Sequence, residues 1–200
     1  MKKASATVLA LLLSLCMAAG AAESTAATKD YTEAPAWESA VPVPEIPAED
    51  PFMQAAISEA LDGISQGHGG PFGAVIVKDG MIVGRGHNRV LADNDPTCHG
   101  EVSAIRDACA NLGTYDLSGC AIYTTGEPCP MCLFACKWAN LEIVYYGCTI
   151  DDNALIGFRD EEFDSLAGGR DQMADYLVCV DRDACLKLFE YYNEMPHMIY

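Results

Sequence analysis

The sequence predicts an α/β sandwich in which a largely parallel sheet follows an opening hairpin. The stretch "PFGAVIVKDGMIVGRGHN" (71–88) has two apolar runs that meet at Asp79-Gly80, a dipeptide typical of tight hairpin turns. Apolar residues recur at helical spacing on both sides of this hairpin. Later strand-like runs alternate with helical segments, which is the order expected of parallel strands joined by helices.

Each expected element has a local signal. A first helix starts near Pro51, and the "GHGG" stretch ends its apolar period. A second helix runs to about Leu112, where Gly113 is placed to end it. Asp181 is the expected N-cap of a last helix. The other expected elements are strands in "CAIYTT" (120–125), "EIVYYG" (142–147) and "DYLVCV" (175–180), and helices in "PCPMCLFACKWAN" (128–140) and "DRDACLKLFEYYNEM" (181–195).

The chain divides into three expected parts. Residues 1–22 carry two lysines, a short apolar run and small residues, the pattern of a signal peptide. Residues 23–50 contain prolines without an apolar period and are expected to form a linker. Residues 51–200 are expected to form the one folded domain. We therefore expect an exported protein, periplasmic or secreted, with a lipoprotein anchored through Cys16 or a cytoplasmic protein as alternatives.

Composition narrows the partners. The chain has 29 acidic and 12 basic side chains, for a formal net charge of −17. Such a surface repels phosphate backbones, so nucleic acid is not an expected partner. Loss of Cys16 with the signal segment would leave nine of the ten cysteines, an odd number. Export favours disulfides among the spare cysteines, yet some must be free, bound to metal or buried.

Cys129 and Cys132 have the C-x-x-C spacing that lets two thiolates bind one metal ion. Pro130 fits the first position of a helix, so both sulfurs lie near a helix N-terminus that favours thiolate. A redox dithiol and a disulfide are the alternatives. His99 adds the third donor of an open, catalytic zinc site. A structural zinc site would need a fourth ligand, such as Cys98.

Glu101 stands two residues after His99, a spacing that diverges in mid-helix but can converge in a first turn. If a helix starts near residue 98, both side chains can face a site beyond its tip. A carboxylate there can take a proton from a zinc-activated water and return it to the substrate. The alternative is a first-turn acid that only stabilises the helix dipole.

The pattern H-x-E followed by P-C-x-x-C is that of zinc-dependent nucleobase deaminases. The sequence resembles the cytidine-deaminase-like superfamily and, within it, bacterial guanine deaminases. The resemblance covers about residues 52–200 and implies a three-layer α/β/α sandwich with a mixed sheet. Its densest parts are "GGPFGAVIVKDG" (69–80), "NDPTCHGEVSAIRDAC" (94–109) and "IYTTGEPCPMC" (122–132).

The resemblance implies catalytic roles residue by residue. His99, Cys129 and Cys132 would hold zinc, and Glu101 would move protons. Asp152, in "DDNALIGFRD", would help proton transfer, with surface solvation as the alternative.

The resemblance also implies substrate contacts. Asn88 in "GHN" suits a purine edge, or else serves a turn. Phe72 and Trp138 would line the pocket, or else belong to the core. Gly100 stands where Ala is usual, so it would leave room beside the substrate and offer an N–H group. Tyr200 would close over the pocket of a partner in a homodimer with swapped C-terminal segments.

The expected activity is zinc-dependent hydrolytic deamination of a purine base, guanine to xanthine with release of ammonia. Guanosine, adenine and cytosine are alternative substrates. A tRNA adenosine deaminase is disfavoured by the acidic surface. The alternative from a different class is a zinc- or dithiol-binding protein without turnover.

Overall fold

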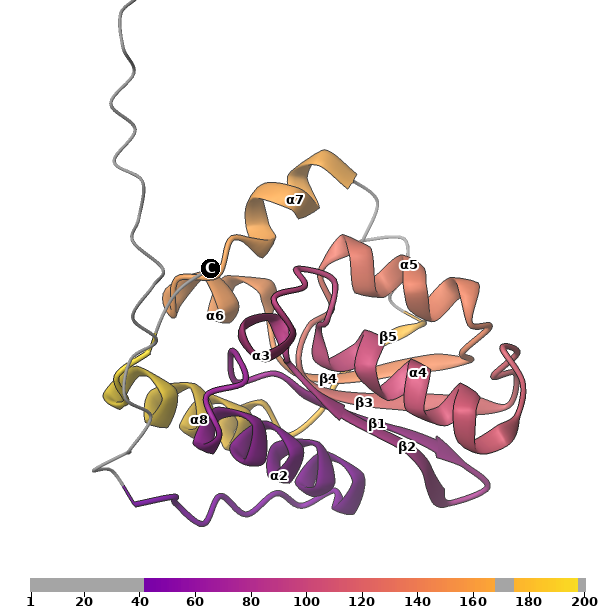
Figure 1. The fold of residues 1–200 in the computed structure, drawn as a ribbon, viewed down its shortest axis with the longest axis horizontal. Helices are drawn as coiled ribbons and strands as arrows, with labels where there is room; N and C mark the ends of the chain where they lie inside the picture. The colour runs from indigo at the N-terminus through magenta and orange to yellow at the C-terminus, as the bar shows by residue number, and fades with distance from the viewer. Residues whose placement is uncertain (1–41, 168–174, 198–200) are drawn as a thin grey trace, which may run out of the picture. The chain divides into compact units, whose positions relative to one another are not determined.

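The structure, a computed structural model of the chain, describes residues 42–167 and 175–197 (Figure 1). The elements in chain order are α2 (Pro51–Ser65), β1 (Gly73–Lys78), β2 (Met81–His87), α3 (Val90–Asp93), α4 (Gly100–Leu112), β3 (Cys120–Gly126), α5 (Pro130–Trp138), β4 (Ile143–Cys148), α6 (Ile150–Leu155), α7 (Asp160–Ala167), β5 (Leu177–Cys179) and α8 (Arg182–Glu194). Among these residues, no helix is long and apolar enough to cross a membrane.

One mixed sheet of five strands organises the domain, in the order β2-β1-β3-β4-β5. Strand β1 pairs antiparallel with both β2 and β3, whereas β3, β4 and β5 run parallel. The hairpin turn forms at Asp79 and Gly80, whose φ angles of 50° and 73° are both in the left-handed region. The predicted hairpin and the parallel strands behind it are therefore confirmed.

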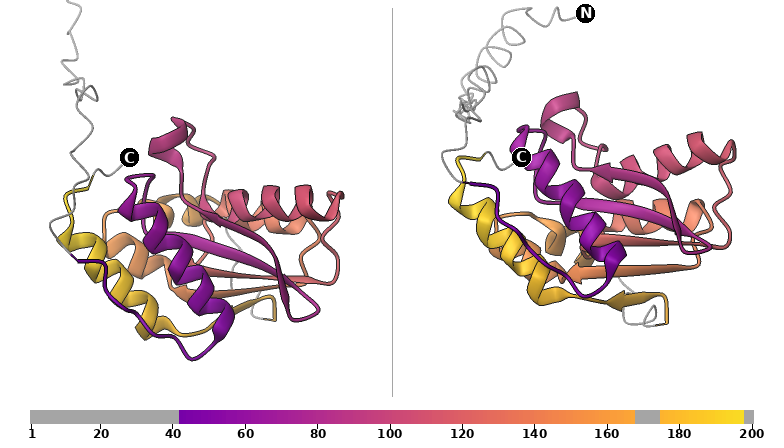
Figure 2. Two further views of the ribbon diagram at one scale, coloured as in Figure 1. Left: turned by 60° about the horizontal axis from the view of Figure 1, so that its bottom comes forward. Right: turned by 90° about the horizontal axis from the view of Figure 1, so that it is seen from below.

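Helices cover both faces of this sheet, as the two views in Figure 2 show. On one face, buried side chains of α2 and α8, such as Ile57 and Leu188, form one apolar cluster. On the other face, Ala104 of α4 and Leu133 of α5 pack with strand residues in a second cluster. The predicted three-layer α/β/α sandwich is confirmed.

The start of α8 differs from its prediction. Asp181 is the N-cap residue, as expected, but its side chain makes no cap hydrogen bond to α8. Its carboxylate accepts instead from the backbone N–H of Asp50, at 2.9 Å, immediately before α2. Ile46, upstream of α2, is buried in the same core cluster. Asp181 thus ties the start of the folded part to its last helix.

Helix α4 lies directly on the backbone of β2, because two glycines face it. A Cβ atom on Gly84 would lie 2.6 Å from the Ala104 carbonyl oxygen, and one on Gly86 would lie 2.4 Å from the Ala104 nitrogen. These separations are shorter than van der Waals contact, so only glycine permits the approach. The distance of α4 from the sheet, and with it the location of the residues at the α4 N-terminus, depends on Gly84 and Gly86.

We predict that Gly84→Ala lowers the free energy of unfolding by about 1–3 kcal/mol, because its Cβ overpacks a backbone contact that no rotamer can relieve. Urea denaturation followed by circular dichroism measures this loss. Met81→Ala, on the same strand but 66% exposed, is the control and should change stability by less than about 0.5 kcal/mol. A neutral Gly84→Ala would contradict the close packing of α4.

Candidate metal centre and substrate pocket

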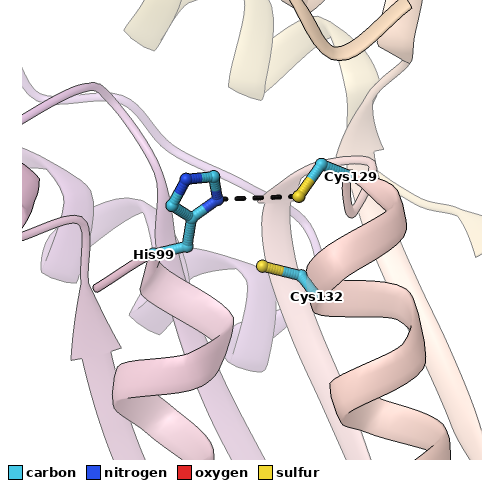
Figure 3. A group of neighbouring side chains, drawn as sticks. All are labelled: His99, Cys129 and Cys132. Atoms are coloured by element: carbon cyan, nitrogen blue, oxygen red, sulfur yellow. Dashed lines mark hydrogen bonds between the residues drawn. The ribbon is translucent and has the colours of Figure 1, made fainter. Parts of the chain in front are cut away.

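Two helix N-termini meet at the site, each with a metal-ligating residue at its N-cap. His99 precedes α4 and Cys129 precedes α5, both with extended backbone and neither with a side-chain cap hydrogen bond. Pro130 occupies the first position of α5, as predicted. Since neither N-cap side chain is used by its own helix, both are turned toward the gap between the helices (Figure 3).

His99, Cys129 and Cys132 form one cluster of potential ligands. Their ligand atoms lie within 4.8 Å of one another, and among the described residues no other His, Cys, Asp and Glu side chains form such a group of three. His99 Nδ1 lies 3.7 Å from Cys129 Sγ. The structure therefore brings together the three predicted metal ligands from two separate helices.

The three side chains of the cluster differ in charge when no metal is bound. Hydrogen bonding from Cys132 and from His99 outweighs burial and lowers the pKa of Cys129 to about 4. Burial alone would lower the pKa of His99, but its hydrogen bond to Cys129 and the nearby Glu101 raise it to about 9. Burial raises the pKa of the Cys132 thiol well above its ordinary value. Without metal, the cluster thus holds one thiolate beside one imidazolium.

Glu101 lies in the first turn of α4 and is 5% exposed. Burial, followed by the charge of Cys129, raises its pKa to about 7, although His99 acts in the opposite direction. A carboxylate with a pKa near neutrality can both accept and return a proton at physiological pH. The convergence of His99 and Glu101 at the helix tip agrees with the prediction from their spacing.

The donor set fits an open zinc site better than a closed one. One imidazole nitrogen and two thiolates suit zinc, which keeps a fourth position for water in catalytic sites. Cys98 does not join the cluster, because its sulfur lies 3.3 Å from both Asp95 Oδ2 and Arg106 Nη1. All nine cysteines among the described residues are free thiols.

A cavity of about 360 Å³ opens over the cluster, a size that suits a small ligand. Its walls are mainly apolar, with His99, Cys129, Arg159 and Asp160 as the polar groups. The complete lining is Pro96, His99, Cys129, Pro130, Met131, Phe158, Arg159, Asp160 and Phe163.

The acid that the structure brings to this cavity is Asp160, which the sequence reasoning missed. It accepts a hydrogen bond of 2.9 Å from Asn153 Nδ2, and its charge acts on His99. The predicted acid, Asp152, does not line the cavity. Thr149 Oγ1 and Arg182 Nε donate to Asp152 Oδ2 at 2.9 and 2.7 Å, so its carboxylate links α6 to α8. The "GFRD" motif (157–160) was the signal that could have identified Asp160.

Three predicted contact residues lie close to the cluster but not in the cavity lining. Asn88 is 1% exposed and accepts a hydrogen bond of 3.2 Å from the Val90 N–H, as in a turn. Phe72 packs edge-on against Phe158, with ring centroids 4.8 Å apart. A Cβ on Gly100 would lie 2.7 Å from the Phe72 carbonyl oxygen, so backbone fills the room expected there for substrate.

Trp138 and Tyr200 are not placed at the cavity. Trp138 ends α5, whereas Cys129 precedes the first residue of that helix, and its side chain is 85% exposed. Tyr200 lies outside the described residues. Their predicted contacts with substrate stay predictions.

The site places a buried carboxylate, Glu101, beside a cluster of one nitrogen and two sulfur donors where two helices begin. This arrangement is typical of a zinc-dependent hydrolytic site. The chain belongs to the family that carries the cytidine and deoxycytidylate deaminase zinc-binding region, whose family model matches residues 47–148.

Relatives of known activity agree with this family. The chain is 52% identical to guanine deaminase of Bacillus subtilis over 109 residues, which cover 54% of this chain and 70% of that one. The X-ray structure of that enzyme matches with a TM-score of 0.54 over 55% of this chain and 70% of that chain. A tRNA-specific adenosine deaminase of Aquifex aeolicus is 42% identical over 48% of this chain and 62% of its own length. The protein NE0047, in complex with 2,6-diaminopurine, is 29% identical, with a TM-score of 0.65 over 74% of this chain and 83% of that chain.

The prediction of an exported protein is wrong, because it conflicts with the cytoplasmic enzyme family to which the guanine deaminase relative belongs. The prediction rested on the composition of residues 1–22, which lie outside the described residues. The composition of an N-terminal segment, here two lysines followed by a short apolar stretch, is not sufficient to predict export.

We predict that Cys129 is the most reactive thiol of the metal-free protein at about pH 6, because its pKa of about 4 makes it a thiolate that faces the cavity. Its labelling by iodoacetamide, followed by peptide mass spectrometry, should fade as the pH falls through about 4 and should stop when zinc is added. Cys179 is exposed, but burial of its sulfur raises its pKa, so it should remain a thiol and react slowly. Cys179→Ser is therefore the control and should leave the labelling of Cys129 unchanged. Faster labelling of Cys179 would contradict the charge state inferred for the cluster.

Proposed function

We propose that this chain is a zinc-dependent hydrolase that deaminates a purine base, most specifically guanine to xanthine with release of ammonia. The observation that carries the proposal is the juxtaposition of His99, Cys129, Cys132 and buried Glu101 beneath an apolar cavity. The 52% identity to a guanine deaminase supports the choice of base.

The roles follow from the geometry. His99, Cys129 and Cys132 would hold zinc, which would supply an activated water for attack on the carbon that bears the amine. Glu101 would accept one proton from that water and deliver it to a ring nitrogen. It would then take the second proton from the newly added hydroxyl and deliver it to the amine. One C–N bond breaks, one C–O bond forms, and ammonia leaves. Burial of Glu101 keeps its pKa near 7, where both transfers are accessible.

The cavity suits a flat, polar heterocycle. Phe158, Phe163 and Met131 offer apolar contact to ring faces, while Arg159 donates and Asp160 accepts hydrogen bonds. Asp160 stands beside the metal ligands and would bind the departing amine. Asn88 and Phe72 would support the pocket from behind its lining, and Gly100 would bring the Phe72 carbonyl close.

Transfer RNA is the second candidate substrate, because the tRNA-specific adenosine deaminase of Aquifex aeolicus is a relative at 42% identity. The charge of the chain opposes it. With 29 acidic and 12 basic side chains, few cations are available to neutralise phosphates. A free purine base carries no phosphate and meets no such repulsion.

We also propose that two copies of the chain associate through α5. Met131, Phe134 and Trp138 are 37%, 50% and 85% exposed and lie at helical spacing on this helix. This apolar stripe supports the homodimer that the family resemblance implies. Trp138 would then meet a second copy of the chain, and Tyr200 would approach the partner's pocket.

We predict that Glu101→Gln lowers ammonia release from guanine by at least about 10²–10⁴-fold, because the amide cannot accept a proton. Zinc content by plasma emission spectrometry should stay near one per chain, since Glu101 is not a ligand. Cys132→Ser should instead lose the metal. If zinc-loaded wild-type protein releases no ammonia from guanine, adenine, cytosine or guanosine, the proposed function is wrong.

We predict that Phe134→Glu with Trp138→Glu converts a dimer into a monomer, because buried charge opposes an apolar interface. Sedimentation equilibrium measures the mass. Leu155→Glu is the matched control, since Leu155 is 80% exposed on α6 and should leave the dimer intact. A wild-type chain that sediments as a monomer would overturn the proposed association.

A further inference from the structure

Two histidines outside the metal centre form a close pair. His68, in the loop between α2 and β1, and His87, the last residue of β2, have ring planes 22° apart and ring centroids 5.1 Å apart. His68 Nδ1 lies 2.8 Å from His87 Nε2, which is hydrogen-bond distance. A pair so close must share a single proton between the two facing nitrogens, because two donors or two acceptors would repel.

Arg89 decides which nitrogen carries that proton. Its Nη1 lies 3.2 Å from His68 Nδ1, and a guanidinium can only donate. His68 Nδ1 is therefore the acceptor of both contacts, and His87 Nε2 is the donor. On the other side of the His87 ring, Nδ1 faces Glu59 Oε2 of α2 at 3.7 Å. The pair thus joins α2, the end of β2 and the loop that carries His68.

This loop sets the position of Asn88. Gly69 follows His68, and a Cβ at Gly69 would lie 2.0 Å from Asn88 Oδ1, so the loop backbone packs directly on the amide. The His68 carbonyl accepts from the Leu91 N–H at 3.0 Å. The end of the same loop, Phe72, accepts from the Asn88 N–H at 2.7 Å through its carbonyl.

We propose that His68 and His87 are positioning residues, which hold the loop 66–72 against Asn88 and so keep the Asn88 amide and the Phe72 ring in place behind the lining of the purine pocket. This inference rests on the proposed function. Neither histidine lines the cavity, so the His87 to His68 hydrogen bond can act on the purine only through the loop. Loss of that bond lets the loop move while the metal ligands on α4 and α5 stay in place.

The pair also predicts a pH response of its own. A proton on His68 Nδ1 removes the acceptor and places a cation beside Arg89, which disfavours it. The negative charges of Asp62 and Asp93 favour the protonated form. Glu59, with Arg85 beside it, faces His87 from α2. Burial and the charge of Arg89 lower the pKa of His68 below its ordinary value. The hydrogen bond is therefore retained at the ordinary histidine pKa of about 6.5, and it is lost only as the pH falls through the lower pKa of His68 in the folded protein.

The test uses zinc-loaded, full-length protein with guanine as substrate and 8-azaguanine as a binding probe. His87→Leu should raise KM and the Kd of 8-azaguanine about tenfold, which corresponds to one lost orienting interaction. The same variant should keep its zinc content and change kcat by less than about twofold. His87→Gln retains a donor near the Nε2 position and should restore KM.

A double-mutant cycle separates positioning from general stability. In an Asn88→Ala background, His87→Leu should raise KM by less than about twofold, because the amide that the pair orients is gone. His68→Asn keeps an acceptor that does not titrate, so its Kd for 8-azaguanine should not weaken as the pH is lowered from about 7.5 through the pKa of His68, unlike that of the wild type.

An unchanged KM in His87→Leu, or an equal rise in the Asn88→Ala background, would overturn the inference. If His87→Leu fails to fold, His68→Leu removes the acceptor from the loop side of the hydrogen bond. Its KM is then measured with and without Asn88→Ala, as for His87→Leu. Failure of the proposed function is recognised separately, since wild-type protein would then release no ammonia from guanine.

Discussion

The site depends on the meeting of two helix N-termini whose N-cap side chains are turned away from their own helices. His99 and Cys129 stand where Ser, Thr or Asp would usually satisfy the first N–H groups. Because neither side chain makes that bond, both are available to a metal ion. The positive ends of two helix dipoles then face the same point, where they favour the Cys129 thiolate and a buried carboxylate, Glu101, beside it.

The remaining architecture holds these two helices at a fixed separation. Strand β3 leads into α5 and pairs with β1, whose neighbour β2 supports α4 through glycine contacts. On the opposite face, α2 and α8 bury the larger core cluster, and Asp181 ties their ends together. The site therefore rests on backbone contacts across three strands, and the cavity over it is completed by the segment that enters α7.

Signals confined to a few neighbouring residues were sufficient to predict the hairpin and several helix ends, and to single out His99, Cys129 and Cys132 as candidate ligands. The turn at Asp79-Gly80, the stop at Gly113 and the start at Pro130 each follow from a local backbone preference. Long-range partners were not predictable. Asp181 serves α2 rather than its own helix, and the partner of Asp152, Arg182, lies 30 residues away in the sequence. Such contacts depend on tertiary packing.

The glycine contact between β2 and α4 has a consequence for how such a protein can change over generations. The height of α4 above the sheet is set by main-chain atoms at Gly84 and Gly86, which have no rotamers to adjust. Gradual substitution in the core therefore has little means of shifting His99 and Glu101. Variation in substrate choice is left to residues such as Arg159 and Phe163, which line the cavity and belong to neither buried core cluster. Chemistry and selectivity are thereby separated into parts of the chain that can evolve at different rates.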